Sequence, residues 1–181
     1  MTEPTRPPAP GSPDPKMEKV LAIIEPTLGH FFHRPIYLRQ ALQTPGSPIH
    51  DHALNVVETT DARSVEEGNK RLAVVGNAAL ELTVADFFFA RGAEWREIAT
   101  ESKAVATDAS VLQLGHMMEL GPVFDGPDAP THLARTVRAV LGAVFCDGGV
   151  VGLRGVLARF RMFDGETERA VAGAGVGAGA A

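Results

Sequence analysis

The sequence has little of several features that would point to particular classes of protein. Its 181 residues contain a single cysteine, which excludes an intramolecular disulfide and a metal site built only from cysteines. No uninterrupted apolar run approaches the ~20 residues that a membrane-spanning helix needs, so no membrane association is expected. The N-terminus lacks the basic and apolar regions of a secretory signal. These absences favour an intracellular protein of the cytoplasm or nucleus, with a mitochondrial location left open.

Basic charge is also scarce for a nucleic-acid binder. The net charge is −5 at pH 7, whereas such proteins are usually basic. Part of the negative charge lies in a Pro-rich stretch at 1–15 and an Ala/Gly-rich stretch at 164–181, which we expect to be a disordered arm and tail. The region 16–163 is predicted to form one domain that is close to neutral, so a local basic patch can dominate one face.

Strand-like alternation of apolar and polar residues is almost absent, and helical spacing takes its place. The strongest pattern covers 68–91, where Leu72, Val75, Ala79 and Leu82 recur at the spacing of a buried helix and Gly92 can end it. The pattern predicts an all-α fold with further helices at 17–28, 36–42, 94–105, 108–120, 133–149 and 153–160. We expect Asp108 to cap the helix that it opens, and Pro26 to kink or end the first one.

Three segments resemble the ribonuclease III domain. Residues 70–80 read Lys-Arg-Leu-Ala-Val-Val-Gly-Asn-Ala-Ala-Leu, in the frame of the family's signature helix, Glu-Arg-Leu-Glu-Phe-Leu-Gly-Asp-Ala-Val-Leu. Residues 133–149 resemble its second helix motif, Leu-Ala-Asp-x-x-Glu-Ala-x-x-Gly-Ala-x-Tyr-x-Asp-x-Gly. Residues 28–32 resemble its opening Leu-Gly-Tyr-x-Phe. The chain looks like the short, single-domain fungal members of this family, without the double-stranded-RNA-binding domain of larger members.

The resemblance implies hydrolysis of double-stranded RNA with Mg²⁺ or Mn²⁺ held by four acids, two on each helix. The four positions are Ala73, Asn77, Arg135 and Arg138 in this chain. Alanine offers no ligand, and two arginines bring fixed positive charge to a site for cations. We therefore expect a pseudoenzyme with degenerate catalytic positions and no cofactor, Mg²⁺ or Mn²⁺ being needed only if the chain is active. Glu81, one turn beyond Asn77, is a weak candidate ligand.

The two arginines have two interpretations that the sequence leaves open. Arg135 and Arg138 lie three apart on one helical face, so both can bind the phosphates of one RNA backbone. They can equally form salt bridges within or between protein chains. Lys70, Arg71 and Lys103 are further candidates for RNA binding, although Lys70 and Arg71 can also be an exposed helix start.

Family members pair through the signature helix, which implies a homodimer here with Val74 and Val75 at the seam together with Ala73. The first hypothesis is a protein that binds double-stranded RNA, or pairs with an active relative, without hydrolysis. The alternatives are a structural scaffold in a ribonucleoprotein such as the ribosome, and an active endonuclease with non-standard metal ligands. The sequence does not identify the RNA or the pathway.

Overall fold

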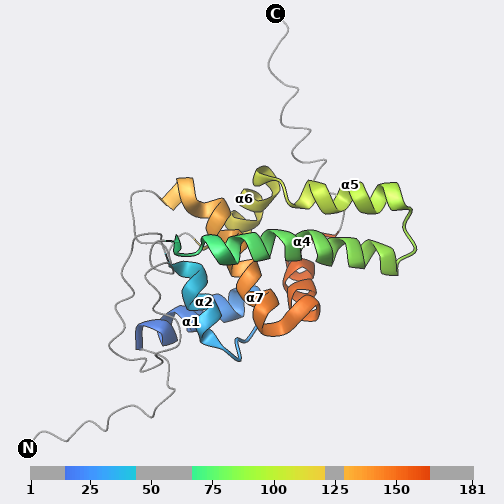
Figure 1. Ribbon diagram of the computed structural model, residues 1–181. Coiled ribbons are helices and arrows are strands. Elements are labelled where there is room, and N and C mark those ends of the chain that lie inside the picture. The colour runs from blue at the N-terminus through green and yellow to red at the C-terminus, as the bar shows by residue number, and fades with distance from the viewer. Residues whose placement is uncertain (1–14, 44–66, 121–128, 164–181) are drawn as a thin grey trace, which may run out of the picture.

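The computed structural model describes residues 15–43, 67–120 and 129–163, with side chains from Met17 and, in the last range, from Leu133. These ranges contain helices and turns and no strand, so the all-α prediction is confirmed. Figure 1 shows the arrangement of the helices. They are α1 (Pro15–Leu28), α2 (Pro35–Leu42), α4 (Lys70–Ala90), α5 (Trp95–Val105), α6 (Asp108–Met117) and α7 (Ala129–Arg159).

The core is built where α4 crosses α7. At the crossing the two backbones nearly touch, because a Cβ on Gly76 would lie 1.7 Å from the carbonyl oxygen of Arg138. A Cβ on Gly142 would lie 2.4 Å from the carbonyl oxygen of Leu72. Only glycine fits at both positions, and this close approach brings residues 69–77 of α4 against the first half of α7.

Helix α7 contains a break at Gly149, next to the gap predicted between the helices at 133–149 and 153–160. Gly149 has a φ of 62° and a ψ of −161°, a backbone conformation that is open to glycine and costly for other residues. The chain turns there, and the second half of α7 packs back on the core through buried Leu153, Val156 and Leu157. The two helices predicted at 133–149 and 153–160 are thus one interrupted element.

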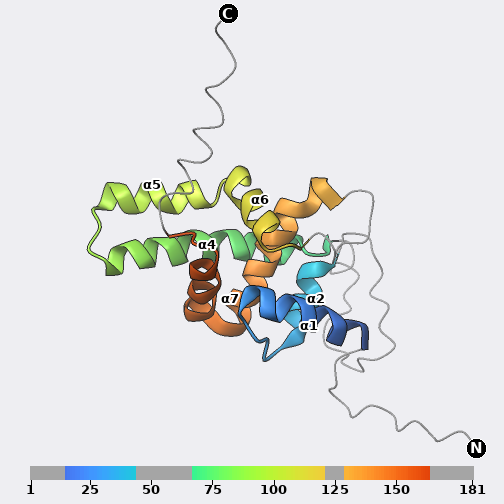
Figure 2. The same ribbon diagram turned by 180° about the vertical axis from the view of Figure 1, so that it is seen from behind.

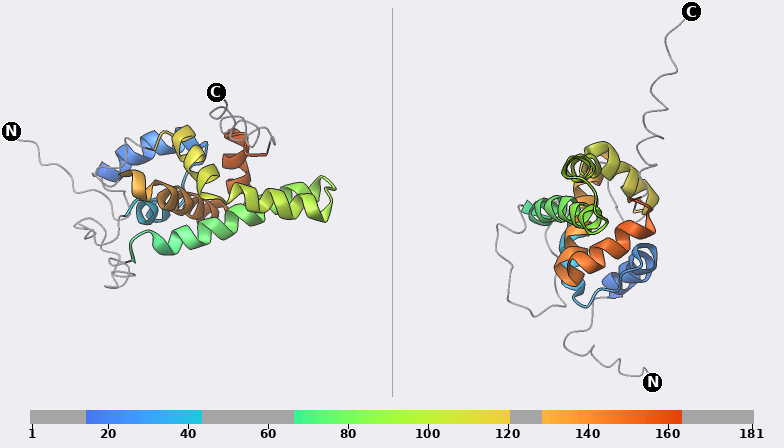
Figure 3. Two further views of the ribbon diagram at one scale, coloured as in Figure 1. Left: turned by 90° about the horizontal axis from the view of Figure 1, so that it is seen from above. Right: turned by 90° about the vertical axis from the view of Figure 1, so that its right-hand side faces the viewer.

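Helices α4 and α5 form an antiparallel hairpin that projects from the rest of the molecule (Figures 1 and 3). Its turn contains Gly92, whose φ of 75° is in the left-handed region where glycine is favoured. Seen from behind, α1 and α2 lie on the side of the molecule opposite α5 (Figure 2). The hairpin therefore has surfaces that no other described helix covers.

The first helix reaches Leu28 as predicted, and Pro26 lies inside it, so the proline does not end α1. Two local predictions need correction. Thr107, not Asp108, caps α6, since its side-chain oxygen accepts from the backbone N–H of Ser110. Helix α6 ends at Met117 rather than near residue 120. The predicted arm and tail, and the connection at 44–66, lie outside the described residues apart from Pro15, which opens α1.

By length and composition, Lys70–Ala90 and Leu133–Arg159 are apolar enough to cross a membrane. Neither helix stands out in the sequence as an uninterrupted apolar run, because polar and charged residues interrupt both. Core helices pass the same test, and 39% and 44% of the two apolar windows are buried inside the structure. These helices are the central pair of the fold, so their apolar character is explained by the core.

Candidate functional site

One stripe of α4 faces α7 across the glycine crossing. Asn69, Ala73 and Asn77 follow one another at intervals of four and so share a helical face. Arg135 approaches one end of the stripe, where its Nε donates to Asn69 Oδ1 over 3.1 Å. Arg138 approaches the other end, where its Nε donates to Asn77 Oδ1 over 3.0 Å. Ala73, which is buried, occupies the turn between them.

The guanidinium of Arg138 joins three elements. Besides its bond to Asn77 on α4, its Nη2 donates to the carbonyl oxygen of Ala106 over 2.9 Å. The same nitrogen lies 2.8 Å from Asp108 Oδ1 at the start of α6, and the Arg138 side chain is only 16% exposed. A shielded cation that bonds to a carboxylate, an amide and a carbonyl acts as a cross-link among α4, α6 and α7.

Asn77 and Glu81 complete this network on α4. The amide nitrogen of Asn77 donates to Glu81 Oε1 over 2.9 Å, while its oxygen accepts from Arg138. The amide orientation thus matches both partners. The Glu81 carboxylate, which lies one turn from the stripe on α4, therefore already accepts a hydrogen bond from Asn77.

Arg135 belongs to a second network, centred on Asn69. Asn69 is buried, and its side-chain nitrogen donates to the carbonyl oxygen of Ala41 over 3.0 Å and to Thr136 Oγ1 over 3.1 Å. This asparagine ties α2, α4 and α7 together and was missed by the sequence analysis, although it directly precedes the signature helix. Arg135 retains one donor, Nη2, that is shielded from solvent and makes no hydrogen bond.

These residues do not fit a Mg²⁺ site. Mg²⁺ requires oxygen ligands in octahedral geometry, mostly carboxylates and waters. Ala73 offers no donor atom, the Asn77 oxygen accepts from a cation, and two guanidinium groups flank the stripe. Within the described ranges no group of three His, Cys, Asp or Glu residues is placed to hold a metal ion.

The other RNA-binding candidates lie on the surface. Lys70 and Arg71 are exposed at the start of α4, and Lys103 is exposed on α5. Arg71 Nε lies 3.9 Å from Glu67 Oε2, with 71% of the arginine side chain exposed. An exposed pair of this length is weak, so the charge of Arg71 remains open to an anionic partner.

The opposite face of α4 is apolar and uncovered. Val74 is 72% exposed, Val75 38%, Leu82 52% and Phe89 74%. With exposed Ala78, they lie along one side of the helix, at spacings of one, three, four and seven residues. Ala73 is not part of it, since it is buried inside the domain, so the predicted seam segment is corrected to begin at Val74. We call Val74, Val75, Ala78, Leu82 and Phe89 the outer stripe.

A polar cluster that the sequence analysis missed lies where the α1–α2 turn meets α7. The Asp147 carboxylate is fully shielded and accepts from the backbone N–H groups of His33 (3.0 Å) and Arg34 (2.8 Å). His30 Nε2 and His33 Nδ1 lie 3.1 and 3.3 Å from Asp147 Oδ2. Burial opposes ionisation of this carboxyl, but the hydrogen bonds outweigh it and hold its pKa below its ordinary value.

The neighbouring Cys146 is half-buried, and burial raises the pKa of its thiol against the opposing charge of Arg34. A raised pKa keeps the thiol protonated and unreactive. The hydrogen bonds of Asp147 therefore hold the α1–α2 turn against α7, which is a structural role.

The helices of this chain have the arrangement of the ribonuclease III nuclease-domain fold. The nuclease domain of ribonuclease III from Campylobacter jejuni, described as flexible in a region involved in dimer formation, has the same fold at a TM-score of 0.58 and 17% identity. The match covers 80% of this chain and 96% of that one. No family model matches the chain.

Curated bacterial proteins named ribonuclease 3 are similar to this chain in sequence. Ribonuclease 3 of Syntrophotalea carbinolica is 31% identical over 150 residues, covering 77% of this chain and 60% of that protein. Ribonuclease 3 of Pseudothermotoga lettingae is 28% identical over 149 residues, covering 76% and 60%. The chain thus spans about 60% of the length of these relatives. It belongs to the ribonuclease III domain family; the likeness to short fungal members stays a prediction.

Proposed function

We propose that this ribonuclease III domain binds double-stranded RNA as a homodimer and does not hydrolyse it. The observation that supports the loss of hydrolysis is the position of Arg138, which bonds to Asn77, Ala106 and Asp108 between the two helices. Metal-dependent hydrolysis needs cations there to activate water and stabilise the leaving oxygen. A guanidinium stays charged and repels such a cation.

We assign the RNA contact to exposed cations on α4 and α5 rather than to Arg135 and Arg138. Arg138 has partners inside the domain, and the free donor of Arg135 is shielded from solvent. These geometries favour the salt-bridge interpretation of Arg138. Lys70, Arg71 and Lys103 are exposed, as phosphate-binding side chains must be. Membership in a family of double-stranded RNA nucleases supports duplex RNA as the ligand.

The outer stripe supports the homodimer. Five exposed apolar side chains lie along one side of α4, and exposed apolar patches on soluble proteins often mark interaction sites. The same surface would accept an active relative in a heterodimer, the second partner that we propose. Val74 stands where the family carries a phenylalanine that enters the partner, so we expect a weaker association than in the family.

Incubation of the pure protein with end-labelled duplex RNA and Mg²⁺ or Mn²⁺ tests both parts of the proposal. We expect a shifted complex and uncut RNA, with the affinity falling steeply as salt rises. The double variant Lys70→Ala with Arg71→Ala should bind more weakly and with a smaller salt slope. Cleavage by the unaltered chain would support an active enzyme with non-standard ligands. Absence of binding would leave the scaffold hypothesis.

A restored site tests the metal argument separately. The variant with Ala73→Glu, Asn77→Asp, Arg135→Asp and Arg138→Glu places four carboxylates along the α4–α7 crossing. It should gain a melting temperature that rises with added Mg²⁺ or Mn²⁺, because a ligand that binds only the folded state stabilises it. The variant that carries only Ala73→Glu and Asn77→Asp is the control, and its carboxylates should pair with the remaining arginines. A folded quadruple variant without a metal response would contradict our placement of the site.

A further inference from the structure

The two members of the ion pair between Arg138 and Asp108 differ strongly in exposure. The Arg138 side chain is 16% exposed, whereas the Asp108 side chain is 81% exposed. In a second ion pair of α7, the side chains of Arg154 and Asp86 are exposed to similar extents, 40% and 45%. Asp108 is therefore the partner of Arg138 that lies on the solvent side of the guanidinium.

The guanidinium of Arg138 is also held by two partners that carry no charge. Its Nε donates to Asn77 Oδ1 over 3.0 Å, and its Nη2 donates to the carbonyl oxygen of Ala106 over 2.9 Å. These acceptors fix the position of the cation and leave its charge uncompensated. Among the described residues, Asp108 is the carboxylate that pairs with Arg138. Without Asp108, the site would present a cation that is already in position for another anion.

The other charges near Arg138 are mixed in sign. Glu81 accepts a hydrogen bond from the amide nitrogen of Asn77, whereas Arg138 bonds to the amide oxygen. Arg135 adds a second positive charge on the same face of α7, and its Nη2 has no acceptor. The two arginines thus face the two carboxylates of Glu81 and Asp108, so loss of Asp108 would leave this region positively charged.

We propose that Asp108 occupies a phosphate-binding position at Arg138 and thereby weakens the binding of RNA by this domain. Phosphate oxygens accept hydrogen bonds from a guanidinium as carboxylate oxygens do. Asp108 is tethered beside the cation, so any phosphate group has to displace it. The ion pair is in this sense an autoinhibitory contact, in which a side chain of the domain takes the place of the ligand.

The position adjoins the RNA surface proposed above. Lys103 lies in the last turn of α5, and Asp108 lies in the first turn of α6. The turn between these helices is compact, since the N–H of Ala106 donates to the carbonyl oxygen of Lys103 over 3.2 Å. A phosphate backbone that is bound by Lys103 would meet the Asp108 carboxylate at the same corner of the molecule. The effect on RNA rests on the proposed function, whereas the binding of free phosphate does not.

Inorganic phosphate tests the site without RNA. The melting temperature of Asp108→Ala is measured in about 50 mM sodium phosphate and in sodium chloride of equal ionic strength. We expect phosphate to raise it by about 2 °C more than it raises that of the unaltered chain, because a ligand that binds the folded state stabilises it. The unaltered chain shows the general effect of phosphate on protein stability. Equal gains in the two proteins would overturn the proposal.

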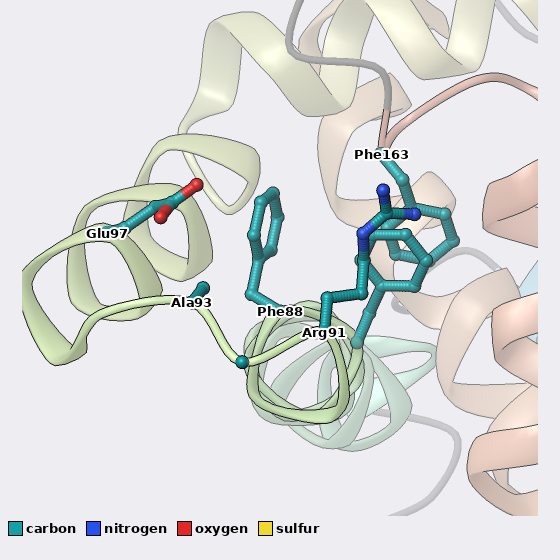
Figure 4. A pocket seen from close by; sticks show the side chains of 7 residues that line it. Phe88, Arg91, Ala93, Glu97 and Phe163 are labelled. Carbon is teal, nitrogen blue, oxygen red and sulfur yellow. The ribbon is translucent and has the colours of Figure 1, made fainter.

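Glu97→Ala is the matched control, because Glu97 is an exposed acid in the first turn of α5, as Asp108 is in α6. In Figure 4 it stands across Phe88 from Arg91, and among the described residues it has no ion-pair partner. Its removal changes the net charge as removal of Asp108 does, but frees no cation. It should respond to phosphate like the unaltered chain.

The double variant Asp108→Ala with Arg138→Gln tests whether Arg138 is the phosphate ligand. Glutamine keeps an amide donor at this position and removes the charge. The double variant should lose the extra response to phosphate. A response as large as that of Asp108→Ala alone would place the phosphate elsewhere and overturn the proposal.

Duplex RNA tests the consequence for the proposed function. Asp108→Ala should bind it about fivefold more tightly than the unaltered chain, with a salt slope that is steeper by about one. Glu97→Ala should gain less. Duplex binding that is equal in Asp108→Ala and the unaltered chain would overturn the autoinhibitory contact and leave the proposed function. A phosphate response without duplex binding by any variant would overturn the proposed function and leave the phosphate position at Arg138.

Discussion

The two faces of α4 differ in how completely they are covered. The inner face meets α7 at a contact so close that Gly76 lies against the carbonyl group of Arg138, and its polar groups find partners in Arg135 and Arg138. The outer face presents the outer stripe to solvent. The inner face is thus covered by the domain itself, whereas no described residue of the chain covers the outer stripe. Three substitutions test this contrast and a fourth tests the contact of α7 with the α1–α2 turn, in order of their expected effect on stability.

The largest effect is expected from Gly76→Ala. The new Cβ would lie 1.7 Å from the Arg138 carbonyl oxygen and 2.7 Å from its carbon, and helix backbones cannot yield as flexible side chains do. We expect a loss of about 3 kcal/mol in the free energy of unfolding, measured by urea denaturation.

Gly155→Ala is the control for that variant. Gly155 is a helical residue of α7, and a Cβ added there would meet no neighbouring atom within 4 Å. Alanine at this position should raise stability by about 0.5–1 kcal/mol. Similar behaviour of the two variants would show that the two helices are not in close contact at Gly76.

Arg138→Met should have the next largest effect. The variant keeps an unbranched side chain but leaves Asn77 Oδ1 and the Ala106 carbonyl oxygen without their donor. We expect a loss of about 2 kcal/mol, the cost of unsatisfied buried groups. Arg71→Met is the control, because Arg71 is 71% exposed and forms only a long ion pair; it should change stability by less than about 0.5 kcal/mol. Equal losses would mean that Arg138 is not a cross-link.

Asp147→Asn tests the hydrogen bonds between α7 and the α1–α2 turn. Its effect on stability should depend on pH. An asparagine cannot accept at both positions, so we expect a loss of about 1–2 kcal/mol at neutral pH. Because the folded pKa of Asp147 is lowered, its contribution is fully present above the unfolded value of about 3.9 and is lost as the pH falls through the folded value.

The measurement is the difference in unfolding free energy between the unaltered chain and Asp147→Asn from pH 2 to pH 7. The gap should narrow as the pH falls below about 4. A gap that widens with acid would contradict the assigned hydrogen bonds to His33 and Arg34.

Val74→Glu should change monomer stability least, by less than about 0.5 kcal/mol, because Val74 is 72% exposed. It should nevertheless dissociate the proposed dimer, since a charge in an apolar interface loses its water. Light scattering across a concentration series measures this. The control is Val151→Glu, at an 84% exposed valine on α7 outside the outer stripe. A dimer that survives Val74→Glu would move the interface away from α4.

Much of the fold follows from local patterns. The helix over 94–105 was predicted within one residue, and Gly92 ends the helix before it, because period, capping and glycine signals are local. The two faces of α4 were harder to assign, since it carries apolar residues on both. Ala73 was therefore placed at the dimer seam, whereas it is buried inside the domain.

The sequence by itself determined the family, the helical fold and the replacement of four acids by Ala73, Asn77, Arg135 and Arg138, because these depend on residue identity and spacing along one chain. Only the tertiary structure decided what the arginines do. Arg138 meets Asp108, thirty residues away, and His30 meets Asp147 across 117 residues. No periodicity encodes such pairs, since they form only when the packing of the helices brings residues that are distant in the sequence together.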